Sequence, residues 1–405
     1  MKTVDILIKN ASEILTLKGP KTPRIQKEMS NLSIINNGSV AIDNGKIVKA
    51  AKNLDYKGEI IIDAKGKTVM PGFVDSHTHL VFAGSREFEL DMKLKGCSYM
   101  DILNEGGGIF YTVKKTRSAT FKDLIFDSKK RLDTMLLHGT TTCEAKSGYG
   151  LETKTELKIL KVQKKLGQIH PVEIVSTFLG AHAIPNEINS EDYINLVIDD
   201  MIPEIKEYAQ FCDVFCEKDV FTIEQSKKIL DAGKKYGLIP KIHADEIVDT
   251  GGAKLAAAVG AISADHLLKS SDLGLMDMAK SKVLGVLLPG TPFSLMMNEY
   301  SNARKMIELG VPVALASDLN PNCWTENMQL IIQLACFNMK MTPAEAITAA
   351  TFNSACAIGL NQKIGSLEKN KQADVIILNC PSYEFLPYHF GVNLVEKVIK
   401  KGRVV

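Results

Sequence analysis

The middle of this 405-residue chain alternates short apolar runs, rich in β-branched residues, with longer amphipathic stretches. Such alternation is typical of parallel strands joined by helical crossovers, because a strand covered on both faces needs a continuous apolar run. The runs that we interpret as strands are residues 72–77, 140–144, 172–179, 213–216, 240–243, 261–266, 283–288 and 313–317. Eight strand–helix pairs over roughly 280 residues predict an α/β fold, a (β/α)₈ TIM barrel.

Helix signals lie between these runs. Residues 120–137 end before Gly139 and residues 152–166 end before Gly167, and glycine is typical just past the end of a helix. The sequence Thr-Pro-Ala-Glu at 342–345 has the pattern of a capping box with proline at the first helical position. A doubly wound open sheet shows a similar alternation, but no glycine-rich dinucleotide-binding motif follows an early strand, so the barrel is favoured.

Both ends of the chain predict strands of a different kind. Short alternating segments at 4–8, 40–42, 47–49 and 60–63, and again at 373–378 and 395–405, are separated by turns such as Asn44-Gly45. We therefore expect a small β-sandwich-like domain built from both ends, residues 1–69 and 360–405, beside a barrel domain of residues 70–359. The polar residues 18–32, with two prolines, predict a surface loop within the first sheet.

Charge and composition exclude several classes of protein. The 49 basic and 47 acidic residues leave a net charge of +2, too small to indicate a nucleic-acid or anionic-membrane partner. No apolar run reaches membrane-spanning length, and the first residues show no export signal. The eight cysteines are scattered, mostly in apolar runs, which is typical of reduced thiols. We expect a cytoplasmic protein whose partner is a small molecule, with no nucleic acid and no membrane.

Two histidines separated by one residue, His77 and His79, follow an apolar strand. Side chains two apart in a strand point the same way, so both rings can face one metal ion. A lone His-x-His motif is common, but His243, His266 and Asp318 also stand at the carboxyl ends of predicted strands, where barrel enzymes have their active sites. Taken singly, His266 fits a buried structural histidine and Asp318 a helix cap. Together, three imidazoles and a carboxylate leave an open position for water on Zn²⁺ or iron.

Long passages in this order resemble the amidohydrolase superfamily, and most closely its hydrolases of histidine breakdown, nearly from end to end. The passages are Pro71–Arg86, Gly106–Gly108, Lys146–Gly150, Phe178–Ala183, Lys241–Glu246, Ser263–Leu267 and Ser317–Pro321. The resemblance implies a barrel plus a small β domain from both chain ends, in agreement with the patterns above. It also implies that metal-activated water hydrolyses the ring C–N bond of 4-imidazolone-5-propanoate, giving N-formimidoyl-L-glutamate.

The same resemblance implies a set of site residues. Those implied to bind metal are His77, His79, His243 and Asp318; those implied to bind substrate are Arg86, Tyr149, His182, Glu246, Asn320, Asn322 and Cys323; and those implied to act in catalysis are Glu246, His266 and Asp318. A carboxylate three residues after a ligand suits a general base, and the planar fork of Arg86 suits the propionate tail. His266 suits a hydrogen bond to the developing oxyanion. Simpler interpretations are a solvated charge for Arg86, a packed aromatic for Tyr149 and an N-terminal helix acid for Glu246.

The chain departs from the expected pattern in the loop after the last strand. Asn322 and Cys323 stand where glycine followed by serine or threonine is expected. Asparagine restricts the backbone more than glycine, and a thiol is a weak hydrogen bonder, so we expect contacts from the backbone here rather than from the 323 side chain. No lysine ends the 172–179 run, where two-metal members carry a carboxylated lysine. We therefore expect one metal ion per subunit, Zn or Fe, and interpret Lys146 as a lysine behind the site or at the surface.

Two other functions stay open. A ring deaminase of the cytosine or guanine type, or another cyclic amidohydrolase, would share the metal set and the His-x-x-Glu spacing, and release of ammonia would identify a deaminase. A metal- or ligand-binding scaffold without activity would show no turnover when loaded with metal. A homodimer is expected from the frequency of such assemblies and from the resemblance.

Overall fold

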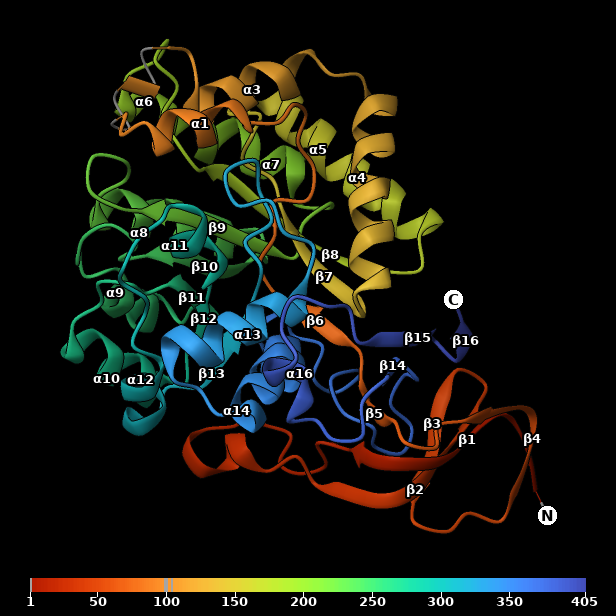
Figure 1. Cartoon of the computed structure of the whole chain (residues 1–405). Helices are drawn as coiled ribbons and strands as arrows, with labels where there is room; N and C mark the ends of the chain where they lie inside the picture. The colour runs from red at the N-terminus through yellow and green to blue at the C-terminus, as the bar shows by residue number, and fades with distance from the viewer. Residues whose placement is uncertain (1, 98–100, 103–104) are drawn as a thin grey trace.

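The computed structural model describes residues 2–97, 101–102 and 105–405. Eight parallel strands follow one another in chain order around a barrel (Figure 1). They are β6 (Phe73–Asp75), β7 (Thr140–Lys146), β8 (Glu173–Ala181), β9 (Phe211–Cys216), β10 (Ile239–Ala244), β11 (Ser263–His266), β12 (Leu284–Leu287) and β13 (Val313–Leu315). Each predicted run overlaps one of these strands, so the predicted barrel is confirmed, and the open doubly wound sheet is not what the chain forms.

The barrel closes through loops that lie beyond the ends of its first and last strands. Thr78 and Leu319 form a parallel bridge. The His79 N–H donates to the Leu319 carbonyl at 2.8 Å, and the Asp318 N–H donates to the His77 carbonyl at 3.1 Å. Three of these five residues, His77, His79 and Asp318, are candidate metal ligands, and the other two are their neighbours in the chain. The hydrogen bonds that close the barrel therefore also bring the candidate ligands together.

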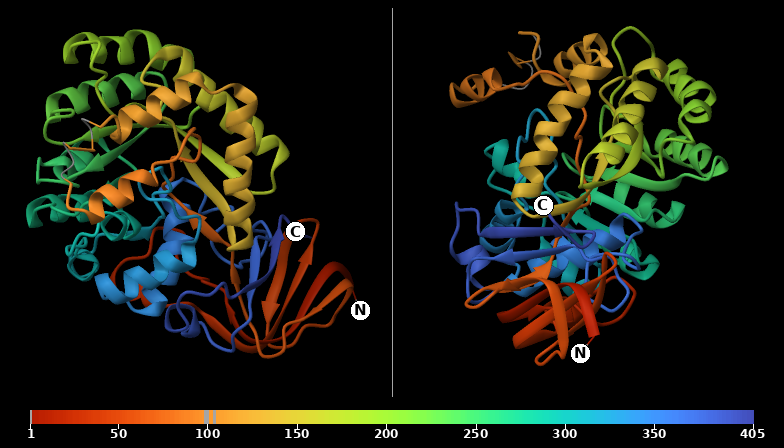
Figure 2. Two further views of the ribbon diagram at one scale, coloured as in Figure 1. Left: turned by 45° about the horizontal axis from the view of Figure 1, so that its top comes forward. Right: turned by 90° about the vertical axis from the view of Figure 1, so that its right-hand side faces the viewer.

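Helices surround the barrel strands (Figures 1 and 2). The longer ones are α3 (Gly108–Ser118), α4 (Phe121–Leu137), α5 (Thr153–Ile169), α8 (Ile223–Lys235), α9 (Gly252–Val259), α10 (Asp272–Ser281) and α13 (Met328–Met339). The shorter ones are α1 (Phe88–Leu94), α6 (Ser190–Asn195), α7 (Ile202–Ile205), α11 (Gly290–Ser294), α12 (Ala303–Leu309), α14 (Pro343–Thr348), α15 (Ser354–Ala357) and α16 (Phe385–Tyr388), with the π-helical segments η2 (Leu196–Met201) and η3 (Ala349–Asn353). The predicted capping box is present, since the Thr342 side chain accepts from the Glu345 N–H.

Both ends of the chain form one second sheet (Figure 1). Its strands are β1 (Lys2–Leu15), β2 (Ile34–Asp43), β3 (Lys46–Ala51), β4 (Tyr56–Asp63), β5 (Thr68–Pro71), β14 (Val375–Leu378), β15 (Val395–Lys400) and β16 (Arg403–Val404). The order is β16-β15-β14-β5-β1-β2-β3, with β4 beside β1, so β5 joins the N-terminal to the C-terminal strands. The predicted common sheet is confirmed, while the domain boundaries at 69/70 and 359/360 stay a prediction.

A single residue, Gly72, separates β5 of the second sheet from β6 of the barrel. A Cβ atom at position 72 would lie 2.3 Å from Thr141 Cγ2, so no side chain fits here without a shift of β7. The predicted strand at 72–77 includes residue 72, and the apolar residues 68–71 just before it were not predicted as a strand of the second sheet. Two consecutive apolar strands with one glycine between them cannot be told apart by periodicity.

The prediction that residues 18–32 form a surface loop is wrong for part of this segment. It contains the 3₁₀ helix η1 (Gln26–Ser30), in which Met29 is buried, and Arg24 is 4% exposed. The Arg24 N–H donates to Asn353 Oδ1 at 2.8 Å, and the guanidinium lies over the ring of Phe352 at 4.5 Å. The polar composition of the segment gave no indication of these contacts. One buried arginine and one buried methionine are enough to attach the segment to the barrel.

No helix within the described residues combines the length and apolarity that crossing a bilayer takes.

Candidate metal centre and active site

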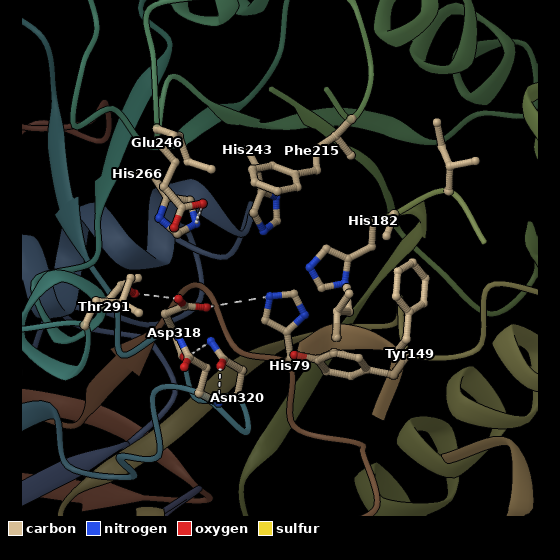
Figure 3. Close-up of a pocket in the computed structure, with 18 of the residues that line it drawn as sticks. His79, Tyr149, His182, Phe215, His243, Glu246, His266, Thr291, Asp318 and Asn320 are labelled. Carbon is tan, nitrogen blue, oxygen red and sulfur yellow. Dashed lines mark hydrogen bonds and ion pairs between the residues drawn. The ribbon is translucent and has the colours of Figure 1, made fainter. Parts of the chain in front are cut away.

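The predicted metal ligands meet at the carboxyl ends of the barrel strands (Figure 3). Ring nitrogens of His77, His79 and His243 lie within 4.8 Å of one another, and so do ligand atoms of His77, His266 and Asp318. All five residues are buried. The structure therefore brings together the four predicted metal ligands and the predicted catalytic histidine.

Several of these buried ring nitrogens have no hydrogen-bond partner. Among the described residues, His77 Nε2, His79 Nδ1 and His243 Nε2 are buried and unpaired. An unsatisfied buried polar atom costs about 1–3 kcal/mol, so a cluster of them indicates a site built for a ligand. Asp318 Oδ1 lies 3.5 Å from His77 Nε2 and 3.6 Å from His79 Nε2. Nitrogen lone pairs beside a carboxylate are donors that fit a divalent metal ion.

Burial keeps these histidines neutral, as metal ligands must be. It lowers the pKa of His77, His79 and His243 well below the usual range, and positive charge on neighbouring groups lowers each further. The carboxylate of Asp265 lies 2.7 Å from His77 Nδ1 and accepts its proton in a hydrogen bond. This contact leaves His77 Nε2 with its lone pair free for the site.

A fully buried ionic network lies behind the histidines. Lys146 Nζ lies 2.7 Å from Asp213 Oδ2, 3.1 Å from Glu144 Oε1 and 3.3 Å from Asp265 Oδ2. Lys241 Nζ lies 3.0 Å from Glu144 Oε2. Burial alone would lower the pKa of Lys146, but the three carboxylates outweigh it and raise that pKa. Lys146 therefore lies behind the site, and the alternative of a surface lysine is wrong.

This network supports two of the candidate ligands. Asp265 contacts both Lys146 and His77, while Asp213 contacts Lys146 and lies 3.1 Å from His243 Nδ1, outside hydrogen-bond geometry. Three carboxylates against two ammonium groups leave one net negative charge beneath the ring nitrogens. A negative charge here favours a cation on the other side of the rings.

Asp318 is held through both its carboxylate and its backbone carbonyl. Thr291 Oγ1 donates to Asp318 Oδ2 at 2.5 Å, and Asn320 Nδ2 donates to the Asp318 carbonyl at 2.7 Å (Figure 3). The backbone of Asp318 adopts φ of 54°, a left-handed conformation that is uncommon outside glycine. Burial raises the pKa of Asp318 to about 6 despite the hydrogen bond from Thr291.

Glu246 lies across the cavity from Asp318, next to His266 (Figure 3). Its Oε2 is 3.7 Å from His266 Nε2. Burial, and then the charges of Asp318 and Glu217, raise the pKa of Glu246 to about 8, whereas burial lowers the pKa of His266 to about 4. A carboxyl group that gains and loses a proton near neutral pH, beside a neutral imidazole, suits proton transfer.

The comparisons with known proteins cover almost the whole chain. The model described as "Amidohydrolase family" matches residues 68–405. The chain belongs to the amidohydrolase family. The imidazolonepropionase of Alkaliphilus metalliredigens (strain QYMF) is 51% identical over 413 residues, covering 99% of this chain and 98% of the relative. The imidazolonepropionase of Geobacillus kaustophilus (strain HTA426) is 53% identical over 414 residues, covering 99% and 97%. Within the family, the chain stands among the imidazolonepropionases.

Solved structures agree on the fold. An adenosine deaminase from Xanthomonas campestris with bound zinc has a TM-score of 0.74 at 16% identity, covering 100% of this chain and 93% of that one. At this identity the likeness shows the amidohydrolase fold alone.

The cavity of this amidohydrolase measures about 560 Å³, a size typical of small-molecule sites. Tyr149 and His182 line it, as predicted. The His182 Nδ1–H donates to the Gly148 carbonyl at 3.0 Å, and the ring stacks on His79 with centroids 4.8 Å apart. Burial lowers the pKa of His182 to about 4, so the ring is neutral and presents Nε2 as an acceptor.

Arg86 also lines the cavity, but two N–H groups of its guanidinium already make hydrogen bonds within the protein. Its Nε donates to Glu89 Oε1 at 2.7 Å, and its Nη2 donates to Glu89 Oε2 at 2.8 Å. Glu89 was not singled out from the sequence. The interpretation of Arg86 as a freely solvated charge does not hold, since its side chain is only 9% exposed.

In the loop after the last barrel strand, two of the three predicted substrate-binding residues lie at the cavity. Asn320 and Asn322 line it, whereas Cys323 is buried behind it with Sγ 3.6 Å from the Ser317 carbonyl. Asn320 Oδ1 accepts from the N–H groups of Asn322 and Cys323 at 2.7 and 3.0 Å. Asn322 is not among the described residues with a left-handed backbone, so the loop does not need glycine there.

Three residues that lie against the predicted ligands were not singled out from the sequence, namely Thr291, Asp265 and Asp213. One signal could have found two of them. Asp213 and Asp265 interrupt strand runs that are otherwise apolar or small, and a charge inside a barrel strand is costly unless it is paired. Thr291 carries no such signal, because it lies in a separate helix, α11, far from Asp318 in the chain.

Proposed function

We propose that this amidohydrolase hydrolyses the ring C–N bond of 4-imidazolone-5-propanoate to N-formimidoyl-L-glutamate in the breakdown of histidine. The observation that carries the proposal is the identity of about half of all positions, over the full length, to imidazolonepropionases. The cavity agrees with it in chemistry, because it combines a cluster of metal-ligand type with an arginine suited to a carboxylate tail.

We propose that His77, His79, His243 and Asp318 hold one metal ion per subunit, Zn or Fe. The unpaired Nε2 atoms of His77 and His243 support this choice, and so does the Asp318 carboxylate, which lies 3.6 Å from His79 Nε2. When bound, such an ion supplies Lewis acidity that activates water near neutral pH. Imidazole and carboxylate ligands suit both metals, so metal analysis of the purified protein decides between them.

The residues around the cavity suit a proton relay. We assign Glu246 as the base that takes a proton from the attacking water and delivers it to the departing ring nitrogen. The water oxygen joins the carbonyl carbon, the ring C–N bond breaks, and the carbonyl carbon becomes the α-carboxylate of the product. The pKa of Glu246, about 8, suits both halves of this transfer.

Neighbouring groups support the relay. His266, neutral and 3.7 Å from Glu246, donates a hydrogen bond to the developing oxyanion or orients the water. Asp318, which accepts a hydrogen bond from Thr291, takes part in the same proton transfer. Tyr149, His182, Asn320 and Asn322 contact the substrate from the cavity wall, and Arg86 binds its tail. Cys323 lies behind the wall and contributes to the site through its backbone N–H bond to Asn320.

The test is turnover by the metal-loaded protein. We expect loss of imidazolonepropionate absorbance with formation of one equivalent of N-formimidoyl-L-glutamate, identified by mass. Removal of the metal by a chelator should abolish turnover, and adding back Zn²⁺ or Fe²⁺ should restore it. Release of ammonia from a nucleobase, without action on imidazolonepropionate, would show a deaminase instead. Undetectable turnover in protein with a full metal complement would show a binding scaffold.

We further propose that the protein is a cytoplasmic homodimer. None of the eight cysteines, all of which lie within the described residues, forms a disulfide, which fits a reducing compartment. Closed twofold dimers are the commonest assembly of soluble enzymes. Light scattering on the purified protein should give twice the chain mass of 44.4 kDa, and a mass of 44.4 kDa would refute the dimer.

A further inference from the structure

Helix α1 has an unusual buried residue. Its seven residues, Phe88–Leu94, are all described, and the buried one among them is a carboxylate, Glu89, at 1% exposure. Its apolar residues Leu90 and Leu94 are 52% and 67% exposed. A short helix normally buries apolar side chains and keeps charges in water. Here a carboxylate attaches the helix to the protein.

Two neighbours compensate the buried charge. Arg86 binds both oxygens of Glu89, and the Gly108 N–H donates to Glu89 Oε1 at 2.7 Å. Burial alone would raise the pKa of Glu89, but these contacts outweigh it and lower that pKa, so the carboxylate is ionised. A Cβ atom on Gly107 would lie 2.9 Å from Glu89 Oε1, so the approach of this passage to Glu89 requires glycine. The glycines at 106–108 are thereby linked to Arg86 through Glu89.

The guanidinium keeps a usable edge. Arginine has five N–H donors, and Glu89 takes one from Nε and one from Nη2. Three N–H groups remain, and two of them form the Nη1–Nη2 edge, which can bind a second carboxylate. Arg86 also lines the cavity. A second cation lies close by: Lys93 lines a neighbouring cavity with Arg86 and donates to Asn322 Oδ1 at 2.6 Å.

We propose that Glu89 is a positioning residue that fixes Arg86 and thereby sets the length of the acid tail the enzyme accepts. A guanidinium held by two hydrogen bonds cannot follow its ligand, so the distance from its free edge to the reacting ring is constant. We expect that a propionate tail spans this distance and that a tail shorter by one methylene does not reach. The inference rests on the proposed function, because it concerns the tail of that substrate.

The test compares two substrates, imidazolone with a propionate tail and imidazolone with an acetate tail. We expect the wild-type enzyme to prefer propionate by roughly 10- to 200-fold in kcat/KM, the range that one methylene ordinarily gives. Glu89→Gln should raise KM for the propionate substrate about tenfold with kcat within about twofold, and reduce the preference to below about threefold. Asp91→Asn, a charge change at an exposed position of the same helix, is the matched control and should leave both values unchanged.

Glu89→Asp serves as the second variant if Glu89→Gln does not fold. It keeps the charge but withdraws the carboxylate by one methylene, and should loosen Arg86 in the same way. If Glu89 had a purely structural role, its replacement would lower kcat and affect the substrates with either tail equally. That result, or an unchanged KM, would overturn the inference. The proposed function would still stand, because it is tested by the activity of the wild-type enzyme. A wild-type enzyme that turns over neither imidazolone would overturn both.

Discussion

Asp265 Oδ2 lies 2.7 Å from His77 Nδ1, and both side chains are fully buried. Ser263 Oγ donates to the other oxygen of Asp265 at 2.7 Å, so the carboxylate cannot rotate away. This pair fixes which nitrogen of His77 carries the proton and which faces the metal site.

Replacing Asp265 with asparagine should weaken metal binding. An amide can still contact His77, but it no longer selects the Nδ1–H tautomer or adds negative charge behind the ring. We expect the dissociation constant for Zn²⁺ to rise about 10- to 100-fold, measured by competition with a chelator. Asp277→Asn, on the outer helix α10, is the matched control. Equal affinity in Asp265→Asn and wild type would contradict the role of the pair.

Glu246→Gln should lower kcat by about 10²- to 10⁴-fold while KM changes little, because the amide cannot accept the proton of the attacking water. Arg86→Ala should do the reverse and mainly raise KM. Equal effects of the two variants on both parameters would count against these assignments.

The pH dependence of kcat/KM should show the ionisation of Glu246. Burial and two nearby carboxylates raise the pKa of Glu246 to about 8, and the base acts in its ionised form. The rate should therefore rise with pH toward a midpoint at or below about 8, since a bound cation favours the carboxylate. Measurement from pH 5.5 to 9 should show this rising limb in the wild type and none in Glu246→Gln. A flat profile in the wild type would exclude Glu246 as the base.

Glu173 should stabilise the protein except in acid. Burial alone would raise its pKa, but Lys363, Lys400 and Gln372 outweigh it and lower that pKa to about 2. A lowered carboxyl pKa adds stability above the unfolded value of about 4.5, and this stability is lost as pH falls toward 2. Because the carboxylate is partly exposed, we expect Glu173→Gln to lose on the order of 1–2 kcal/mol at pH 7 in urea denaturation. The difference from wild type should disappear near pH 2, and Glu187→Gln, an exposed control, should show none.

Cys323→Ser should change kcat and KM by less than about twofold, because the thiol faces the Ser317 carbonyl behind the cavity. Asn322→Gly, one residue away, removes the acceptor for Lys93 and should raise KM roughly 2- to 10-fold. Steady-state kinetics on both variants check this contrast. A larger effect at 323 than at 322 would mean that the thiol reaches the substrate.

The sequence alone was sufficient to predict the barrel and the histidines and carboxylates that line the candidate site. Apolar runs identify strands buried on both faces, and histidines at their ends are placed by the topology alone, as His79 and His243 show. Contacts made by single side chains between distant segments leave no periodic signal. The pairing of Arg86 with Glu89, the attachment of Arg24 to Asn353 and the support of Asp318 by Thr291 are of this kind. They follow from packing rather than from pattern.

The hydrogen bonds between the loops of His77–His79 and Asp318–Leu319 have a consequence for synthesis of the chain. A nascent polypeptide lacks Asp318, which we propose as the last metal ligand in chain order, and cannot close its ring of strands until Leu319 has left the ribosome. Translation products that end before Asp318 should therefore bind no metal in the native manner.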